Sequence, residues 1–405
     1  MLLEFNIKNY KSFVENSKIS MVASSIKEHG STLIEVNGTS VLPLCAIFGA
    51  NGSGKSNYIE SFDFFRNLVI GKYNDLMYSK PYIFDTILVN SPTEFEISVV
   101  DKNDNKEYRY GFVIYKDKIE EEWLFSKVFS KTRKLKERCL FYRENGEYIK
   151  TDILNSKEKK ELEFVNSLSS NKELLLTNIS KRGNVMFSFV YTYLLEKCYV
   201  MNYSNSSEWD IDSNKMQNVI KRLYLDKSLQ ENVSNLLHNI DSSIVRIEIR
   251  KELNKNFEET YVIDSVHYDS EGNYITVPFN LESCGSKKML IFSVFMIDSL
   301  SRGAILFIDE LDSKLHPLIL RYIINNYSNK SVNSTGAQLV FTSHNLICLD
   351  SSDLRRDEIW FVEKINQKSS IFSLYDFKEE NIRNDLSFGK NYLNGRFGAI
   401  PFIDE

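Results

Sequence analysis

Residues 49–56 read Gly49-Ala50-Asn51-Gly52-Ser53-Gly54-Lys55-Ser56, which fits the pattern G-x-x-x-x-G-K-[ST] of a phosphate-binding loop. Three of the 16 glycines in the chain fall within it. Such backbone can wrap a polyphosphate because glycine tolerates unusual dihedral angles and carries no Cβ to block a close approach. The pattern therefore predicts that backbone N–H groups from Gly49 to Asn57 surround phosphate oxygens. Lys55 is expected to reach the β- and γ-phosphates, and the hydroxyl of Ser56 to ligate Mg²⁺.

The residues on either side of the loop predict the strand and the helix that such a loop requires. An apolar run, Leu44-Cys45-Ala46-Ile47-Phe48, lies between Pro43 and Gly49 and is typical of a buried strand. From Ser56 onward the apolar residues recur at helical spacing, namely Ile59, Phe62, Phe65 and Val69. The N-terminus of a helix has its own preference for anions. The order of strand, loop and helix therefore supports a nucleotide site.

Composition and charge are those of an ordinary soluble globular protein. The 405 residues suffice for one large domain or two modest ones, and 42% are hydrophobic and 26% charged. A net charge of −5 gives no overall attraction to nucleic acid or to anionic membranes, so any such surface must be local. The five cysteines are scattered without a C-x-x-C pair, which argues against a zinc site and fits a reducing cytoplasm. Neither a signal peptide nor a membrane-spanning segment is expected.

A second motif ends an apolar run with two acids. Residues 304–310 read Ala304-Ile305-Leu306-Phe307-Ile308-Asp309-Glu310, which is typical of a Walker B element. Asp309 is expected to hold Mg²⁺, directly or through water. Glu310 is expected to orient or deprotonate an attacking water. The alternative is a pair of exposed loop acids after a strand, and the phosphate-binding loop already present disfavours it.

Two weaker motifs lie on either side of this acid pair. Residues 338–345 form an apolar run that ends in Thr342-Ser343-His344-Asn345. His344 is expected to contact the γ-phosphate or to polarise the water, although a lone histidine is more often structural. The turn Ser283-Cys284-Gly285-Ser286 opens an apolar helix. Many helices begin with such a cap, so this turn gains significance only from its place just before the acid pair.

The remaining sequence predicts an antiparallel sheet and a block of helices. Residues 1–13 alternate apolar and polar side chains, and residues 17–23 are expected to pair with them as a hairpin. Residues 130–242 are mostly helix-prone and are expected to project as a lobe, in which 215–240 form the clearest amphipathic helix. Strands return from residue 243. Further strands are expected at Tyr82–Val89, Thr93–Val100 and Tyr108–Tyr115, as a meander.

Two groups of basic residues leave their roles open. Residues 131–138 are the one dense basic run and could bind a phosphate backbone, but the run lacks interleaved aromatic residues. Such a run is usually a solvated face of a hairpin or helix. Lys8 and Lys11 lie close in sequence to the phosphate-binding loop, and the alternative is that both are solvated strand lysines.

The four motifs, in this order along the chain, resemble those of the ABC-type ATPase heads of SMC and RecF proteins. The opening Phe5-x-Ile7-x-Asn9-Tyr10-Lys11-Ser12-Phe13 resembles the first strand of such heads. The turn at Ser283 departs from the ABC signature Leu-Ser-Gly-Gly-Gln. It is similar instead to the Glu-Ser-x-Gly-Thr form of a bacterial subfamily of ATPases that includes the RloA/AbiL-type proteins and the ATPase subunit of PARIS phage-defence systems. Residues 309–317 and 391–401 also look like that subfamily, and the resemblance covers roughly 1–115 and 240–405.

The resemblance implies an α/β fold, an ABC/SMC-head-like P-loop NTPase core with an antiparallel β subdomain and an inserted helical lobe. The expected divisions are 1–129, 130–242 and 243–405. Such heads bind ATP and Mg²⁺ and pair head to tail, so that Ser283 and Gly285 of one subunit cap the γ-phosphate held by the other. Glu310, with help from His344, hydrolyses the ATP, and Lys8 or Lys11 matches a residue near the adenine or the phosphates. The glutamine loop of ABC proteins has no clear counterpart in the sequence.

The resemblance also implies a role in phage defence. The first hypothesis is a switch ATPase that regulates or sequesters an effector nuclease acting in trans, with DNA or a phage protein as a trigger. Assembly beyond a dimer, into a ring, is left open. The alternative is a RecF-like, ATP-dependent DNA-binding repair or clamp protein, which the acidity and the single short basic run disfavour. A transporter subunit is disfavoured by the absence of Leu-Ser-Gly-Gly-Gln.

Overall fold

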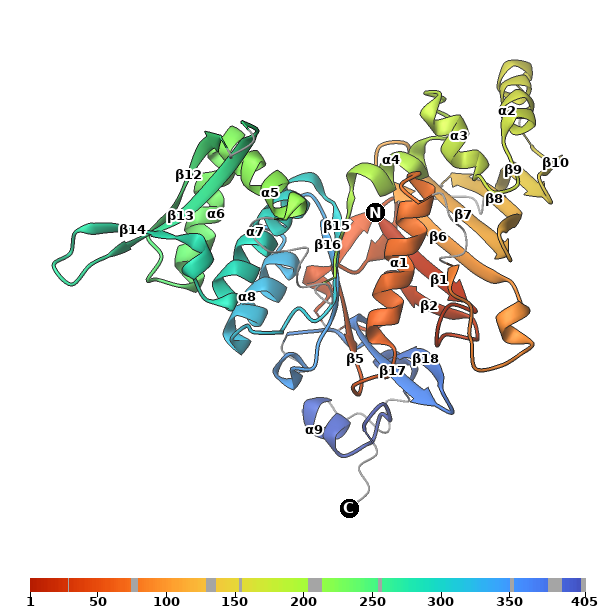
Figure 1. Ribbon diagram of the computed structural model, residues 1–405. Helices are drawn as coiled ribbons and strands as arrows, with labels where there is room; N and C mark the ends of the chain where they lie inside the picture. The colour runs from red at the N-terminus through yellow and green to blue at the C-terminus, as the bar shows by residue number, and fades with distance from the viewer. Residues whose placement is uncertain are drawn as a thin grey trace.

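Two large β-sheets, one mainly parallel and one antiparallel, form the body of the protein (Figure 1). The computed structural model describes residues 1–27, 29–73, 79–128, 136–152, 155–202, 213–253, 257–349, 353–377 and 388–401. Helix α1 packs between the two sheets, and a second group of helices covers the opposite face of the parallel sheet. The site described below lies at one edge of this parallel sheet.

The core sheet carries the sequence motifs. Its strand order is β11-β15-β16-β5-β17-β18, and all neighbours run parallel except β17 and β18, which form an antiparallel hairpin. Every residue of β5 is buried, because its alternate side chains enter two different apolar cores. The strands are β5 (Leu44–Phe48), β11 (Cys198–Met201), β15 (Ile305–Ile308), β16 (Gln338–Thr342), β17 (Ile359–Ile365) and β18 (Lys368–Ser373).

The antiparallel sheet has seven strands in the order β10-β9-β8-β7-β6-β1-β2. Helix α1 (Lys55–Val69) joins it to the core sheet through aromatic contacts on two of its sides. Phe62 stacks on Phe307 of β15 at a centroid distance of 3.7 Å, and Phe65 stacks on Phe112 of β7 at 5.4 Å. The strands are β1 (Leu2–Lys8), β2 (Ser17–Ser20), β6 (Thr93–Asp101), β7 (Lys106–Tyr115), β8 (Lys118–Val128), β9 (Arg138–Glu144) and β10 (Glu147–Lys150).

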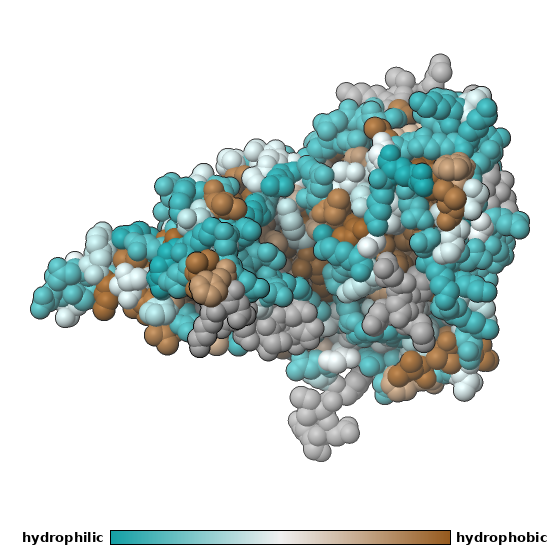
Figure 2. Space-filling model, turned by 45° about the horizontal axis from the view of Figure 1, so that its top comes forward, coloured by the Kyte–Doolittle hydropathy of each residue, from teal (hydrophilic) through white to brown (hydrophobic). Residues whose placement is uncertain are grey.

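The opposite face of the core sheet is covered by helices that carry a three-stranded arm. Figure 2 shows this arm projecting from the body with a largely hydrophilic surface. Its elements are α5 (Asn214–Leu225), α6 (Lys227–Ile240), β12 (Arg246–Leu253), β13 (Glu259–Tyr268), β14 (Tyr274–Pro278), α7 (Cys284–Arg302) and α8 (Pro317–Ser328). The other elements are β3 (Ile34–Val36), β4 (Thr39–Val41), α2 (Ser156–Leu168), α3 (Leu175–Lys181), α4 (Phe189–Glu196), α9 (Phe388–Leu393) and six short 3-10 turns, at 30–32, 88–90, 279–281, 346–348, 356–358 and 374–376.

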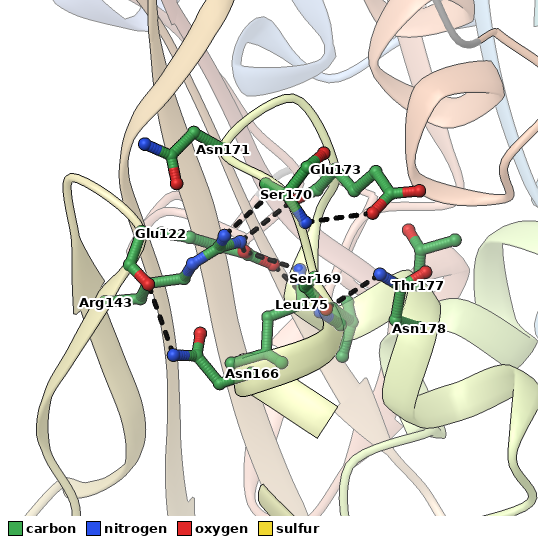
Figure 3. A network of polar contacts seen from close by, with 12 residues as sticks. Glu122, Arg143, Asn166, Ser169, Ser170, Asn171, Glu173, Leu175, Thr177 and Asn178 are labelled. Atoms are coloured by element: carbon green, nitrogen blue, oxygen red, sulfur yellow. Dashed lines mark hydrogen bonds and ion pairs between the residues drawn. The ribbon is translucent and has the colours of Figure 1, made fainter. Parts of the chain in front are cut away.

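A buried polar network fixes α3 to the antiparallel sheet (Figure 3). The carboxylate of Glu122, on β8, accepts hydrogen bonds from the backbone N–H groups of Leu175 and Leu176 at 2.7 and 2.9 Å. Arg143, on β9, lies beside it at 3.5 Å and donates to the carbonyls of Ser170 and Glu173 at 2.9 and 2.8 Å. Both charged side chains are almost completely buried. The first turn of α3 therefore receives its cap from a strand of the sheet.

Two expectations for the antiparallel sheet are confirmed, and one is wrong. The hairpin of β1 and β2 and the meander of β6, β7 and β8 are both present. No strand forms at residues 82–89, where the chain is irregular and ends in a 3-10 turn at Leu88–Asn90. The Asp85 carboxylate accepts from the N–H groups of Ile87 and Leu88 at 2.8 and 3.1 Å, which bends the backbone into a turn.

The residues expected to form a helical lobe occupy three places in the structure. Strands β9 and β10 belong to the antiparallel sheet, and helices α2, α3 and α4 pack in the core beside it. Strand β11 joins the parallel sheet, next to β15. Helices α5 and α6 pack with α7 on the far face. The single helix expected at 215–240 is divided at Asp226, whose side chain accepts from the N–H of Leu229 at 3.0 Å and caps α6.

Candidate nucleotide-binding site

The phosphate-binding loop leads from β5 into α1, as the sequence predicts, and close packing requires glycine at two of its positions, Gly49 and Gly54. A Cβ at Gly54 would lie 2.5 Å from the hydroxyl of Ser369 and 3.0 Å from that of Ser12. Gly54 has φ 118°, in the region that favours glycine, and it is the residue at which α1 begins. The loop thus lies at a helix N-terminus, which is an arrangement that binds phosphate.

Two serines from distant parts of the chain support the loop from outside. The Ser369 hydroxyl donates to the carbonyl of Ser53 at 2.5 Å, and the Ser369 N–H donates to the carbonyl of Ser12 at 2.7 Å. The Ser12 hydroxyl accepts from the Asn57 side chain at 2.8 Å. The hydroxyl of Ser53 itself is buried and has no hydrogen-bond partner within the described residues. The Asn57 side chain thus contacts Ser12, one of the two serines that support the loop.

Lys55 is buried and folds back over the loop. Its ammonium group donates to the carbonyls of Gly49 and Ala50 at 2.8 and 3.0 Å. Burial lowers the pKa of Lys55 to about 8, and the negative charges of Asp309, Glu310 and Asp312 oppose this shift. The ammonium group therefore lies within electrostatic reach of the acids that follow β15.

The acid pair lies where β15 ends, and Thr342 of the neighbouring strand holds both acids. The Thr342 hydroxyl donates to the Asp309 carboxylate at 2.6 Å and accepts from the Glu310 N–H at 2.7 Å. Asp309 is buried, whereas the side chain of Glu310 is exposed. Glu310 has φ 50°, an uncommon conformation for a residue other than glycine. A buried acid suited to a cation thus lies next to an exposed acid suited to proton transfer.

His344 lies two residues beyond β16, at the same edge of the sheet. The backbone N–H of His344 donates to the Asp312 carboxylate at 3.0 Å. Partial burial of the ring and the nearby charge of Lys55 lower the pKa of His344. A neutral imidazole is therefore favoured at pH 7. A cavity of about 250 Å³ is lined by Gly49, Ala50 and Asn51 of the loop together with His344 and Pro401.

The structure brings most of the expected site residues together, but it places three of them apart from the loop. Ser283 caps α7, its hydroxyl accepting from the N–H of Ser286 at 3.0 Å, and Gly285 lies in the same first turn. No hydrogen bond among the described residues joins this turn to the loop. Lys11 forms an ion pair with Glu60, on the second turn of α1. The ammonium of Lys80 contacts the same carboxylate at 2.8 Å.

Three features of the site were not expected from the sequence. The first is Thr342, which the sequence shows only as one of two hydroxyl residues at the end of a predicted strand. Its contacts with the acid pair could not be predicted. Asn202 follows β11, and the N–H of Asp309 donates to the carbonyl of Met201 at 3.0 Å, so this strand end borders the acid pair. Residues 203–212 follow directly and lie outside the described residues. The third feature is the C-terminal segment.

The C-terminal segment completes the loop by a backbone contact. The N–H of Ala50 donates to the carbonyl of Ala399 at 3.1 Å, and the Tyr392 hydroxyl donates to the same carbonyl at 2.8 Å. The N–H of Ala399 donates to the Glu363 carboxylate at 3.0 Å. The Tyr392 ring stacks on Phe361 of β17 at 5.3 Å. The segment at 391–401, noted in the sequence only for its resemblance, is thus packed against the nucleotide site.

The residues of the site fit a Mg²⁺ complex of ATP. Mg²⁺ usually takes one or two carboxylates, substrate phosphates and water, and the candidate protein ligands are Asp309 and the exposed hydroxyl of Ser56. No cluster of three or more His, Cys, Asp or Glu side chains able to hold a metal occurs in the described parts of the chain. Of the basic run, residues 131–135 lie outside the described residues. None of the described helices has the length and apolar character needed to cross a membrane.

Strand order and motif positions together define the class of protein. The phosphate-binding loop, the acid pair and the histidine follow three adjacent parallel strands, and an antiparallel sheet packs on α1. This is the fold of an ABC/SMC-head-like P-loop ATPase.

The chain belongs to the family described as "AAA domain, putative AbiEii toxin, Type IV TA system", which matches residues 44–350. No curated protein matches the chain.

Several solved structures of SMC heads are similar to this chain. The head bound to the C-winged helix domain of ScpA is 13% identical with a TM-score of 0.48, covering 92% of this chain and 97% of that one. The SMC head domain from Thermotoga maritima is 14% identical with a TM-score of 0.43, covering 92% and 98%. The Pyrococcus yayanosii head with a coiled coil and joint is 10% identical with a TM-score of 0.45, covering 98% and 99%.

Proposed function

We propose that this ATPase is a switch in bacterial phage defence, which pairs head to tail around ATP and regulates or sequesters an effector nuclease acting in trans. The family description, with its reference to a toxin of a type IV toxin–antitoxin system, supports a role in such conflict systems. The resemblance of residues 283–286, 309–317 and 391–401 to the RloA/AbiL and PARIS ATPases supports the same role. DNA or a phage protein is the proposed trigger.

The observation that carries the dimer is that no hydrogen bond among the described residues joins the Ser283 turn to the phosphate-binding loop of its own chain. The loop, the acid pair and His344 share one edge of the core sheet, whereas Ser283 and Gly285 lie in the first turn of α7. Ser283 is exposed. A helix N-terminus attracts phosphate, and this one begins apart from the loop of its own chain. A second copy, turned end for end, would bring its Ser283 turn to the γ-phosphate.

Hydrolysis would follow from the positions of the side chains. Glu310, exposed beside the buried Asp309, would take a proton from water as the water oxygen bonds to the γ-phosphorus and the bond to the ADP oxygen breaks. Lys55 and the loop N–H groups would hold the charge that develops on the phosphate oxygens. His344, as a neutral imidazole, would orient the water. Asp309 and Ser56 would hold Mg²⁺, which supplies charge neutralisation.

The native mass of Glu310→Gln with ATP and Mg²⁺, purified from the cell that encodes it, tests this proposal. Glutamine keeps the shape of the side chain but cannot accept the proton, so the ATP-bound dimer should accumulate. A dimer that carries a protein with nuclease activity in stoichiometric amount is the expected result. A dimer that carries DNA alone would favour a RecF-like clamp instead. A monomer with bound ATP would overturn the shared site.

The matched control is Lys55→Ala with Glu310→Gln. This double variant removes the ammonium that neutralises the phosphates, so it should neither bind ATP nor pair. If it pairs as well as Glu310→Gln does, pairing does not depend on the nucleotide and the switch is overturned.

A further inference from the structure

Lys288 connects α7 to the turn that contains Glu310. Lys288 lies in the second turn of α7, five residues after Ser283, and only 7% of it is exposed. Its ammonium group donates to three backbone carbonyls of one turn, those of Glu310 at 2.6 Å, Leu311 at 3.2 Å and Ser313 at 3.1 Å. An ammonium has three donors, so one side chain of α7 holds three peptide groups of the turn after β15.

The turn held in this way is strained at its first residue. Glu310 has φ 50°, and the left-handed conformation costs a residue other than glycine about 1–2 kcal/mol. Both backbone polar groups of Glu310 are bound. The hydroxyl of Thr342 accepts from its N–H, and Lys288 donates to its carbonyl. Thr342 of β16 and Lys288 of α7 thus set the backbone conformation of Glu310.

A second contact joins the same two turns. A Cβ at Gly285 would lie 3.0 Å from the carbonyl of Lys314, so the turn that begins α7 packs directly on the backbone that follows Ser313. Lys314 also has a positive φ, 62°. Displacement of the Ser283 turn would therefore shift the 310–314 turn through Lys288 and through this contact.

Burial of Lys288 carries an electrostatic cost. Burial lowers the pKa of Lys288 to about 8, and the charges of Asp312 and Glu310 oppose the shift. A buried ammonium is costly unless carbonyls and acids surround it, and those around Lys288 belong to the turn next to Asp309. An apolar side chain of similar length would fill the space without binding the turn.

We propose that Lys288 is a positioning residue for ATP hydrolysis, which fixes Glu310 and couples it to the Ser283 turn of the same subunit. The coupling rests on the head-to-tail dimer of the proposed function. In that dimer the Ser283 turn contacts the nucleotide held by the partner, whereas Glu310 acts on the nucleotide of its own subunit. Lys288 would then let occupancy of one site adjust hydrolysis at the other.

The test compares side chains with three, two and no donors at position 288, using the wild type, Lys288→Gln and Lys288→Met. For Lys288→Met, kcat should fall about tenfold or more, equivalent to about 1.4 kcal/mol of transition-state stabilisation. KM for ATP should change less than twofold, because the phosphate-binding loop is untouched. Lys288→Gln should lie between, and it keeps the test valid if the methionine variant does not fold. Unchanged kcat in either folded variant overturns the positioning role.

Lys197→Met is the matched control. Lys197 also donates to a backbone carbonyl of the α7 region, that of Arg302 at 2.7 Å, but at the opposite end of this 19-residue helix. The substitution removes one charge and one such bond far from the acid pair. Its kcat should equal that of the wild type. An equal fall in both variants would show a general loss of helix packing and overturn the specific role of Lys288.

The dependence of turnover on ATP concentration tests the coupling separately. Wild-type turnover should rise sigmoidally, and that of Lys288→Met hyperbolically. Sigmoidal curves of equal steepness, in proteins that both form dimers, would overturn the coupling. A wild type that stays monomeric with ATP would overturn the proposed function and the coupling with it, while the kcat series would still decide whether Lys288 positions Glu310.

Discussion

Thr342 shows how one hydroxyl can define the relation between two acids. It is fully buried, donates to Asp309 and accepts from the N–H of Glu310. The hydroxyl donates to one oxygen of the Asp309 side chain, which fixes the position of a candidate ligand of Mg²⁺. The acceptor direction stabilises the left-handed backbone of Glu310. Together the two contacts need a hydroxyl at position 342, because one uses its hydrogen and the other its oxygen.

Thr342→Val should therefore lower both activity and stability. Valine has nearly the same shape, so packing is kept, but a buried carboxylate and a buried N–H each lose a partner, at about 1–3 kcal/mol each. We expect kcat to fall about tenfold or more and the apparent affinity for Mg²⁺ to weaken. Steady-state turnover over a Mg²⁺ titration measures both effects.

Thr342→Ser is the control for this prediction. Serine keeps the hydroxyl and loses only a methyl group, so its turnover should remain within a few-fold of the wild type. If serine and valine reduce kcat equally, the packing of the methyl group rather than the hydroxyl controls the acids.

At the scale of single residues, the sequence could identify groups by their type but not by their partners. Lys55, Asp309 and Glu310 belong to motifs whose spacing is local, so their proximity to the loop could be predicted. Lys288 and Thr342 act through contacts with a turn 22 or more positions away in the chain, and nothing in their local sequence indicates those contacts.

Among the elements, helix α3 depends most clearly on a partner far away in the sequence. It has only seven residues, too few to be stable alone, and its first N–H groups are bound by Glu122 of β8. Arg143 sits beside that carboxylate and also binds the carbonyls of Ser170 and Glu173, which lead into the helix (Figure 3). The buried ion pair of the sheet, Glu122 and Arg143, therefore also binds the start of the helix and the segment that leads into it.

Arg143→Met should destabilise the protein by about 3–5 kcal/mol, because removal of one member leaves the other charge buried with fewer partners. Calorimetry should show a lower Tm, whereas ATP binding at low temperature should be retained. Arg138→Met, an exposed position on the same strand, should change stability by less than about 0.5 kcal/mol. Equal Tm values for the two variants would contradict a stabilising role for the network.

Dependence on partners far away in the sequence also explains which elements could be predicted. The strands beside the motifs could be predicted from their runs of apolar residues. The meander of β6 to β8 could be predicted from local sequence patterns, because its apolar side chains are buried. The error at 82–89 arose because β-forming residues there are left exposed, Ile83 by 70% and Ile87 by 76%, so no packing selects a strand. The division at Asp226 was missed because a side-chain cap overrode a continuous apolar pattern.

Across the whole molecule, the site draws on segments that are distant along the chain. Ser12, the 49–56 loop, the acid pair and Ala399 meet at one edge of the core sheet. The order of the four motifs along the chain could be read from the sequence, and three of them follow strands that are parallel neighbours in the core sheet. The supports at Ser12, Ser369 and Ala399 depend on tertiary contacts that no spacing indicates. In the proposed dimer, the Ser283 turn reaches the loop of a second molecule.

A mixture of two inactive variants should therefore recover activity. In a heterodimer of Lys55→Ala and Ser283→Arg, one composite site combines the intact loop of one subunit with the intact turn of the other. Turnover should appear on mixing, although neither variant turns over alone. A coupled phosphate-release assay measures it, with native mass to confirm that the heterodimer forms.

A mixture of Lys55→Ala and Glu310→Gln is the matched control. Both substitutions fall in the same half of the composite site, so each site of the heterodimer is defective and turnover should stay absent. Recovery in both mixtures, or in neither when heterodimers form, would contradict a site shared between subunits.

The bond between Ala50 and Ala399 has a consequence for synthesis of the protein. The two residues lie 349 positions apart, yet the carbonyl of one receives the N–H of the other. At about 5–20 residues per second, the ribosome needs roughly 20–70 s to pass from the first to the second. During that time the nascent chain carries a phosphate-binding loop without its final support. The loop therefore lacks this hydrogen bond until residue 399 has been made.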